Sequence, residues 1–436
     1  MRNVFSFLTF LILLFAFSVK VEAYDYDFMF EGVAFKITSS DWNTVELVKG
    51  NMIKPDISYP EIEHNGKVYR VTSIGNYAFQ GFKSMKAYTV TKWVTTIGEF
   101  AFAGCSNLSS VYFEEGSELK IIKANAFNYC TSLTTIIFPE GLEEIGYAAF
   151  AHCGFSEVTF PESLKVLGDY SFSSCPSLSW APISKNVERI GLAPFFDDPE
   201  MKYISHNIYN PNYETLPDGS LFEIKTKTLV EYPCGADKTS YVIPDKVERI
   251  ASASFYGCKK LEKLTLPPSV RQIGDNLTFY WMDSLKEVTT YAKEPFTAAV
   301  VGNAKDIKLV VPFGASERYG LGWGEIEEME PLVLTVSLNG TKQISQIADF
   351  SQVFTLMIGR EEELGNFVLT FNGEDVTSQV TEKRLYTTPP IVKASTLDIT
   401  FDGGGNIADV NGDGTVDVAD IATVIGVMAA NARGWQ

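Results

Sequence analysis

Histidine is almost absent from this chain: His64, His152 and His206 are the only three in 436 residues. That leaves little material for imidazole catalysis or for a zinc site. Basic residues are also in short supply, since 36 lysines and arginines face 54 acidic residues, for a net charge of −18. Such a polyanion repels nucleic acid and anionic membrane surfaces, which argues against both as partners. The chain also lacks a nucleophile elbow, a phosphate loop and a zinc motif, so we expect no enzyme.

No apolar run reaches the roughly 18–20 residues that a membrane helix needs. The run "FSFLTFLILLFAF" at residues 5–17 follows Arg2 and precedes "VEA", which ends at Ala23. A charged residue, a short apolar run and small residues in this order are typical of a secretory signal peptide. The sequence therefore predicts removal of residues 1–23, export to the cell surface or the medium, and no membrane span in the mature chain.

A four-column pattern recurs along the chain from residue 74. Its anchors lie 22–25 residues apart, except for one gap of 60, and they are Ile74, Ile97, Ile122, Ile145, Leu167, Ile190, Ile250 and Ile273. Phenylalanine follows most anchors by five residues, at Phe79, Phe102, Phe127, Phe150, Phe172, Phe195 and Phe255. A leucine-like residue and a short alternating run complete the unit. A turn of this length cannot bury its apolar side alone, so stacked turns forming a solenoid are predicted.

The alternating run of each turn predicts a short strand. In "SSVYFEEG", Val111 and Phe113 point inward and Tyr112 points outward, and we expect the strands of successive turns to form one parallel sheet. The same alternation points Ile137 outward, and Trp180 lies in the equivalent stretch of a later turn. Exposed apolar side chains have no core role, so Tyr112, Ile137 and Trp180 are the candidate ligand face. The alternative is that they are scattered surface residues without a partner.

Five of the six cysteines occupy one position of the repeat, eight residues after the anchor: Cys105, Cys130, Cys153, Cys175 and Cys258. Phe82 and Trp281 fill this position in other turns, which predicts a buried column. Disulfides are the alternative in an exported protein. Column neighbours lie about 4.8 Å apart, more than the roughly 3.5–4.5 Å between bridged Cβ atoms, so free thiols are favoured. Cys234 lies outside the column, and its state stays open.

The phrase "IGxxAFxxCxxLxxVxFPxxLxxIG" resembles the BspA-like, treponemal-type leucine-rich repeats of bacterial surface proteins, over residues 72–330. The stretch from Leu309 is similar to the segment that closes this family's repeats. The resemblance implies a right-handed leucine-rich-repeat solenoid of α/β class, mostly β with short turns and helices. Residues 24–71 alternate like a β cap, and residues 197–240 form an irregular insertion with strands around the Asp218-Gly219 turn.

Two further segments follow the repeats. Residues 331–405 contain strand-like runs with glycine turns, which predicts a small all-β domain of β-sandwich type. Residues 406–436 contain "DVNGDGTVDVAD", with oxygen ligands at alternating positions of a calcium loop: Asp409, Asn411, Asp413, Thr415, Asp417 and Asp420. One calcium ion is the expected cofactor, and the alternative is an acidic linker. The loop and the helical pattern after it resemble a dockerin repeat, which implies a cohesin-like partner; dockerins usually carry two repeats, and this chain has one.

These features predict a secreted or cell-surface binding protein without catalytic activity. The family resemblance implies adhesion to a host or microbial surface protein or glycan through the repeat sheet. The alternative is a non-catalytic accessory component of a polysaccharide-degrading assembly, docked through the calcium repeat. Cys153 and His152 would suggest a catalytic pair, but the side chains of neighbours on a turn diverge, so a bystander histidine is favoured.

Overall fold

The computed structural model describes residues 25–50, 58–274, 277–295, 306–319, 323–338, 341–348, 352–357, 367–381 and 385–401. The expected signal peptide at residues 1–23 and the expected calcium loop lie outside these ranges. Contacts between Cα atoms divide the chain into two units: residues 1–237, 250–260 and 274–283, and residues 238–249, 261–273 and 284–436. Within the described ranges, no helix has the length and hydropathy needed to cross a membrane.

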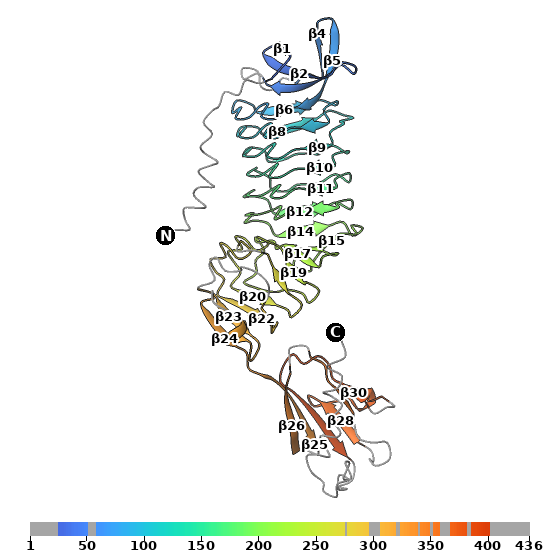
Figure 1. The fold of residues 1–436 in the computed structure, drawn as a ribbon, viewed down its shortest axis with the longest axis vertical. Helices are drawn as coiled ribbons and strands as arrows, with labels where there is room; N and C mark the ends of the chain where they lie inside the picture. The colour runs from blue at the N-terminus through green and yellow to red at the C-terminus, as the bar shows by residue number, and fades with distance from the viewer. Residues whose placement is uncertain are drawn as a thin grey trace. The chain divides into compact units, whose positions relative to one another are not determined.

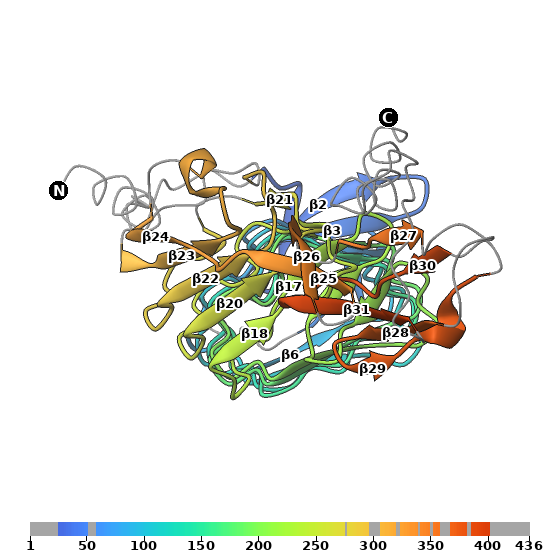
Figure 2. The ribbon, with the colours of Figure 1, turned by 90° about the horizontal axis from the view of Figure 1, so that it is seen from below.

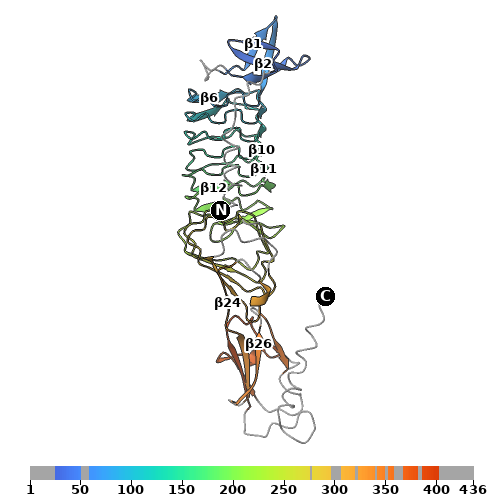
Figure 3. The ribbon, with the colours of Figure 1, turned by 60° about the vertical axis from the view of Figure 1, so that its left-hand side comes forward.

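Five strands precede the first repeat: β1 (Phe28–Phe30), β2 (Val33–Ser39), β3 (Thr44–Lys49), β4 (Glu61–His64) and β5 (Lys67–Ile74). Strands β1, β2 and β3 pair antiparallel, β4 pairs antiparallel with β5, and β3 lies parallel to β5. Figure 3 shows β1 and β2 at one end of the stacked turns. The backbone N–H of Gly75 donates to the carbonyl of Leu47 at 2.8 Å, so these strands cover the first turn.

Each regular turn contributes a two-residue strand that ends on its anchor. These strands are β7 (Thr96–Ile97), β9 (Ile121–Ile122), β10 (Glu144–Ile145), β11 (Val166–Leu167) and β13 (Arg189–Ile190). They stack in parallel with their anchors in register and complete a ten-stranded sheet, in the order β1-β2-β3-β5-β7-β9-β10-β11-β13 with β4 beside β5 (Figure 1). The glycine after the anchor permits this approach, because a Cβ on Gly168 would lie 2.5 Å from the carbonyl carbon of Gly146.

The second strand of each turn forms a less continuous row. Strand β6 (Ala87–Val90) lies parallel to β8 (Ser110–Phe113), and β12 (Trp180–Ile183) lies parallel to β14 (Tyr203–His206). Between these pairs, residues 134–138 and 158–160 belong to no strand, and an isolated bridge links Glu157 to Trp180. The prediction of one parallel sheet for this row is therefore wrong, because the ladder opens in two consecutive turns.

The phenylalanine column runs through the stack as the repeat predicts. Consecutive rings stack with centroids 4.9–5.2 Å apart, and all are buried: Phe79, Phe102, Phe127, Phe150 and Phe172. Each inner ring covers both of its faces with the rings of the turns on either side. The hydrophobic core is therefore continuous from turn to turn, as in a solenoid.

The cysteine column agrees with the sequence in four of its five members. The free, buried thiols each donate to the carbonyl of the column phenylalanine one turn earlier, at 3.1–3.4 Å: Cys105, Cys130, Cys153 and Cys175. The prediction of a free thiol at Cys258 is wrong, because Cys258 forms a disulfide with Cys234, with Cα atoms 4.4 Å apart. The spacing argument compared column members with one another, whereas the partner comes from the irregular insertion, 24 residues earlier.

In the last turn of the first unit, the aromatic and column positions lie one residue later than the repeat predicts. The repeat predicts a buried Trp281, but its side chain is 42% exposed, while the next residue, Met282, is only 6% exposed. Likewise, Phe279 rather than residue 278 packs its ring near Phe255, at a centroid distance of 6.1 Å. One extra residue after the anchor therefore turns Trp281 outward. Phe82, at the same repeat position in the first turn, is buried as predicted.

The insertion at residues 197–240 forms antiparallel strands. These are β15 (Tyr213–Thr215), β16 (Leu221–Glu223) and β17 (Thr228–Glu231). The predicted Asp218-Gly219 turn joins β15 to β16, and Gly219 has a φ of +96°, which favours glycine. Two further short strands end on the next two anchors, β19 (Arg249–Ile250) and β21 (Gln272–Ile273).

The second unit contains its own parallel strands, in the order β18 (Ser240–Val242), β20 (Lys263–Leu266), β22 (Glu287–Thr290), β23 (Lys308–Val311) and β24 (Glu325–Glu328) (Figure 2). A five-stranded sheet follows: β26 (Thr341–Ala348), β25 (Leu332–Leu338), β31 (Ser395–Phe401), β28 (Phe367–Phe371) and β29 (Glu374–Asp375). Strands β27 (Thr355–Met357) and β30 (Leu385–Thr387) form a separate pair. Buried Leu369, Leu397 and Tyr386 share one core. The two helices whose residues are all described, η2 (Ser316–Arg318) and η3 (Thr377–Gln379), are 3-10 turns.

Candidate binding surfaces

The opening in the second strand row forms a groove on the surface of the stack. Its walls are residues 110–113, 135–137 and 157–159, and its volume is about 630 Å³. Strand β8 pairs only with β6, so its other edge faces residues 135–137 across the groove. No hydrogen bond of the described residues uses the backbone N–H or C=O of residues 134–138. We call this feature the sheet groove.

The structure brings two of the three candidate ligand-face residues together. Tyr112 and Ile137 both line the sheet groove, and their side chains are 58% and 84% exposed. Trp180 is 36% exposed and does not line the groove. It lies beside one wall, through its bridge to Glu157. The alternation of inward and outward residues correctly predicts that these side chains are exposed. The groove itself depends on how far apart the turns lie, which no position of the repeat indicates.

The six predicted calcium ligands lie outside the described residues: Asp409, Asn411, Asp413, Thr415, Asp417 and Asp420. Calcium binding at this loop therefore stays a prediction. Within the described ranges, no group of three or more histidine, cysteine or acidic side chains is arranged to hold a metal ion.

The histidines have packing roles in the structure. The ring of His152 stacks on Tyr129 at a centroid distance of 4.0 Å, and burial lowers the pKa of His152. Burial raises the pKa of the neighbouring Cys153 thiol well above its ordinary value, which disfavours a reactive thiolate. His64 stacks on Phe28, also at 4.0 Å. These surroundings explain the residues without a catalytic role.

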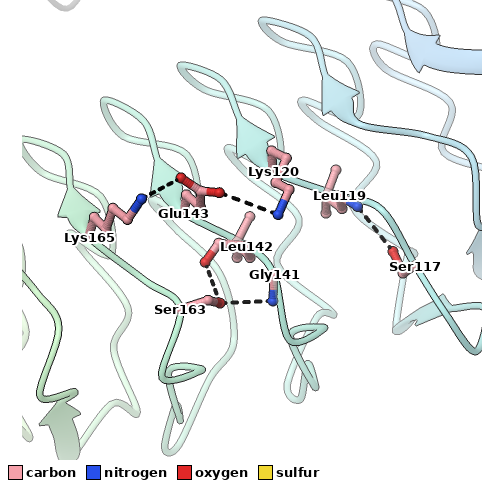
Figure 4. A network of polar contacts seen from close by, with 8 residues as sticks. All are labelled: Ser117, Leu119, Lys120, Gly141, Leu142, Glu143, Ser163 and Lys165. Carbon is pink, nitrogen blue, oxygen red and sulfur yellow. Dashed lines mark hydrogen bonds and ion pairs between the residues drawn. The ribbon is translucent and has the colours of Figure 1, made fainter.

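A polar ladder crosses the turns on the face next to the anchor strands (Figure 4). Glu143 lies between Lys120, at 3.3 Å, and Lys165, at 2.8 Å. Hydrogen bonds from Lys165 and then Lys120 lower the pKa of the Glu143 carboxyl. The sequence analysis did not predict this ladder. Its signal was present, since the three residues occupy the same position in successive repeats.

The repeat register can be compared with known families. A model of the BspA type leucine rich repeat region matches six copies in this chain, over residues 67–178, 116–220 and 232–295. Together these residues make up half of the chain. The chain belongs to the BspA-type leucine-rich-repeat family. All walls of the sheet groove lie within the matched residues, so the groove is built from the BspA-type turns themselves.

Several solved structures are similar to this BspA-type chain. A leucine-rich cell surface protein from Faecalibacterium prausnitzii A2-165 is 21% identical, with a TM-score of 0.49 over 70% of this chain and 94% of that chain. A leucine-rich-repeat protein from Bacteroides ovatus ATCC 8483 is 26% identical, with a TM-score of 0.49 over 66% and 79% of the two chains. The pneumococcal vaccine antigen PcpA is 16% identical, with a TM-score of 0.47 over 70% and 98%. None of the curated proteins compared with the chain matches it.

Proposed function

We propose that this BspA-type protein is exported, is displayed or released at the cell surface, and binds a host or microbial surface protein without catalysing a reaction. The observation that carries the proposal is the sheet groove, where the strand ladder opens and apolar side chains line the walls. The leader sequence at residues 1–23 supports export. Binding through a repeat face is consistent with the family fold, because stacked turns present a broad, nearly rigid surface.

The backbone of the sheet groove suits an extended segment of the partner. Residues 135–138 alternate between exposed and buried side chains, like a strand, but make no ladder hydrogen bonds. Backbone N–H and C=O groups left unpaired at a strand edge are a template for another chain. A peptide lying along the groove would gain main-chain hydrogen bonds there, while its alternate side chains contact the walls.

The side chains of the sheet groove suit a protein partner as well. Tyr112 offers a large ring with two rotatable angles, so little conformational entropy is lost when it is buried. Ile137 adds an aliphatic surface that water covers in the free protein. Trp180 is placed to extend the contact at one edge. Aromatic anchors of this kind dominate the energetics of many interfaces.

The test is a binding array of the mature chain against matrix proteins, mucins and cell-surface glycans. For the partner found, Tyr112→Ala and Ile137→Ala are each expected to weaken binding by about tenfold or more. Tyr147→Ala is the matched control, since Tyr147 is 48% exposed and does not line the groove. Normal binding by both groove variants, or an equal loss in the control, would show that recognition lies elsewhere.

A second candidate function rests on the calcium loop of residues 406–436. Docking through it would make the protein a non-catalytic component of a polysaccharide-degrading assembly, with a cohesin-like domain as its partner. We expect the loop to bind one calcium ion through its six oxygen ligands. Calorimetry should show that the heat of calcium binding disappears in a chain with both Asp409→Ala and Asp413→Ala. Retention of a cohesin-like domain by the parent, but not by this variant, would favour the second function over the first.

A further inference from the structure

A second hollow lies beside the insertion, and no residue of the candidate ligand face contributes to it. Its volume is about 670 Å³. The regular turns supply Glu143, Ser163 and Lys165, and the insertion supplies Tyr209 and Asn212. The volume falls within the roughly 300–1,000 Å³ of small-molecule sites. We call this hollow the insertion groove.

The insertion loop that borders the groove is fixed by one buried side chain. Asn210 is 6% exposed, and its amide group donates to the carbonyls of Ser184 at 2.8 Å and Val187 at 3.2 Å. Its side-chain oxygen accepts from the backbone N–H of Asn212 at 2.8 Å and of Tyr213 at 3.0 Å. Four hydrogen bonds use the full capacity of an asparagine side chain. The loop is therefore held in one conformation before any ligand arrives.

This fixed loop presents an aromatic ring to solvent. The side chain of Tyr209 is 77% exposed and lines the insertion groove, and its backbone N–H donates to the side chain of Asn207 at 3.0 Å. The preceding residue, Ile208, is also 77% exposed but does not line the groove. A ring held at the rim of a polar hollow loses little entropy on binding, because its backbone is already ordered.

The other walls of the insertion groove are polar, and their charges cancel. The lining residues include two lysines, Lys165 and Lys185, and two glutamates, Glu143 and Glu188. Lys165 pairs with Glu143 at 2.8 Å. Figure 4 shows this pair next to Ser163, whose hydroxyl donates to the carbonyl of Leu142 at 2.8 Å. The walls therefore offer hydrogen-bond donors and acceptors side by side, without an excess of either charge.

We propose that the insertion groove is a binding site for a neutral oligosaccharide. One face of a pyranose ring carries C–H groups with partial positive charge, which fits the electron-rich face of Tyr209. The hydroxyl rim of the same sugar needs both donors and acceptors, and Asn186, Lys165 and Glu188 provide them along the groove wall. The site is independent of the sheet groove and of the protein partner proposed there.

The side chains that line the insertion groove favour a neutral sugar over an acidic glycan or a protein segment. An acidic glycan would leave its carboxylates facing Glu143 and Glu188, with both lysines needed to offset them. A protein segment would find only one aromatic ring, Tyr209, and one proline, Pro211, because the other seven lining residues carry a charged, hydroxyl or amide side chain. A small neutral sugar uses the single ring and the mixed polar walls together.

Calorimetry of the full mature chain tests the proposal with cellotriose, xylotriose, mannotriose and chitotriose, and with trigalacturonate as the anionic arm. At least one neutral trisaccharide is expected to bind. Tyr209→Ala should weaken that binding by about tenfold or more, while Tyr209→Phe retains it, since the ring and not the hydroxyl makes the contact. Ile208→Ala is the matched control, and Tyr112→Ala tests independence from the sheet groove; both should bind like the parent.

Four outcomes overturn the proposal. They are the absence of binding to every neutral trisaccharide at millimolar concentration, a preference for trigalacturonate, an equal loss in the Tyr209→Ala and Ile208→Ala variants, and a loss in the Tyr112→Ala variant. Because the sheet-groove proposal is tested with variants of different residues, its failure would leave this result standing, and the reverse also holds.

Discussion

The regular turns between residues 74 and 190 and the insertion at residues 197–240 stabilise the same stack in different ways. In the regular turns, identical apolar columns repeat, and rings such as Phe127 lie between equivalent rings on both sides. Where the insertion begins, the column breaks: Phe195 meets Phe172 at a centroid distance of 6.3 Å with an interplanar angle of 33°, and Asp198 takes the cysteine position.

The insertion replaces periodic packing with buried polar groups and a covalent bond. Asp198 is 2% exposed, and its carboxylate accepts from the backbone N–H of Cys175 at 2.7 Å. Glu231 is 4% exposed and accepts from the N–H of Phe195 at 3.3 Å. The disulfide of Cys234 lies three residues further on. A region without a repeating core therefore depends on individual interactions, and the loss of any one of them should lower its stability.

The largest expected effect concerns the ring column. Phe127→Ala should lower the free energy of unfolding by about 3–5 kcal/mol, because it removes a fully buried ring from the centre of the stack. Phe195→Ala should cost about 0.5–1.5 kcal/mol less, since its ring lacks a stacked partner on each side. Urea denaturation followed by circular dichroism measures both. A larger loss for Phe195→Ala would contradict the idea that regular stacking is the stronger arrangement.

The next effect concerns the disulfide. Reduction, or the paired change of Cys234→Ser and Cys258→Ser, should lower the free energy of unfolding by about 2–4 kcal/mol, because the bond closes a loop of 24 residues.

The four column thiols should resist alkylation in the folded, reduced protein, since burial raises their pKa, to about 12 for Cys105. Mass spectrometry of alkylated peptides measures this. Rapid labelling of Cys130 would contradict its buried, hydrogen-bonded position.

The sequence predicted the core of the regular turns, but of the insertion only its strands and the Asp218-Gly219 turn, for a physical reason. A residue such as Phe127 has the same neighbours as its equivalents one turn away. The residue types that recur at one position of the repeat therefore predict what surrounds each of them. Asn210 and Glu231 have no equivalents in the other turns, and the backbone groups that these side chains bind lie 23–36 residues earlier in the chain. For the candidate sites, the alternation of the strand predicts that Tyr112 is exposed. The groove beside Tyr112 depends on the gap between turns, which is seen only in the structure.

The last expected effect is a pH dependence that differs in sign between the two regions. Burial raises the pKa of Glu231 from 4.5 to about 8, so the folded state keeps a proton that the unfolded state loses. Its contribution to stability is fully present below pH 4.5 and is lost as the pH rises through 8. Burial also raises the pKa of Asp198, which acts in the same direction. Glu231→Gln should therefore flatten the decline in stability between pH 5 and 8, measured by urea denaturation.

Glu143→Gln in the regular turns is the matched control. Hydrogen bonds from Lys165 and Lys120 lower the pKa of Glu143, so its contribution is present above the unfolded pKa and is lost as the pH falls. The effect should be small, because the side chain of Glu143 is 39% exposed and solvent weakens surface ion pairs. Removing this charge should leave the decline above pH 5 unchanged. If Glu143→Gln flattened that decline as much as Glu231→Gln, the buried carboxyls of the insertion would not be its source.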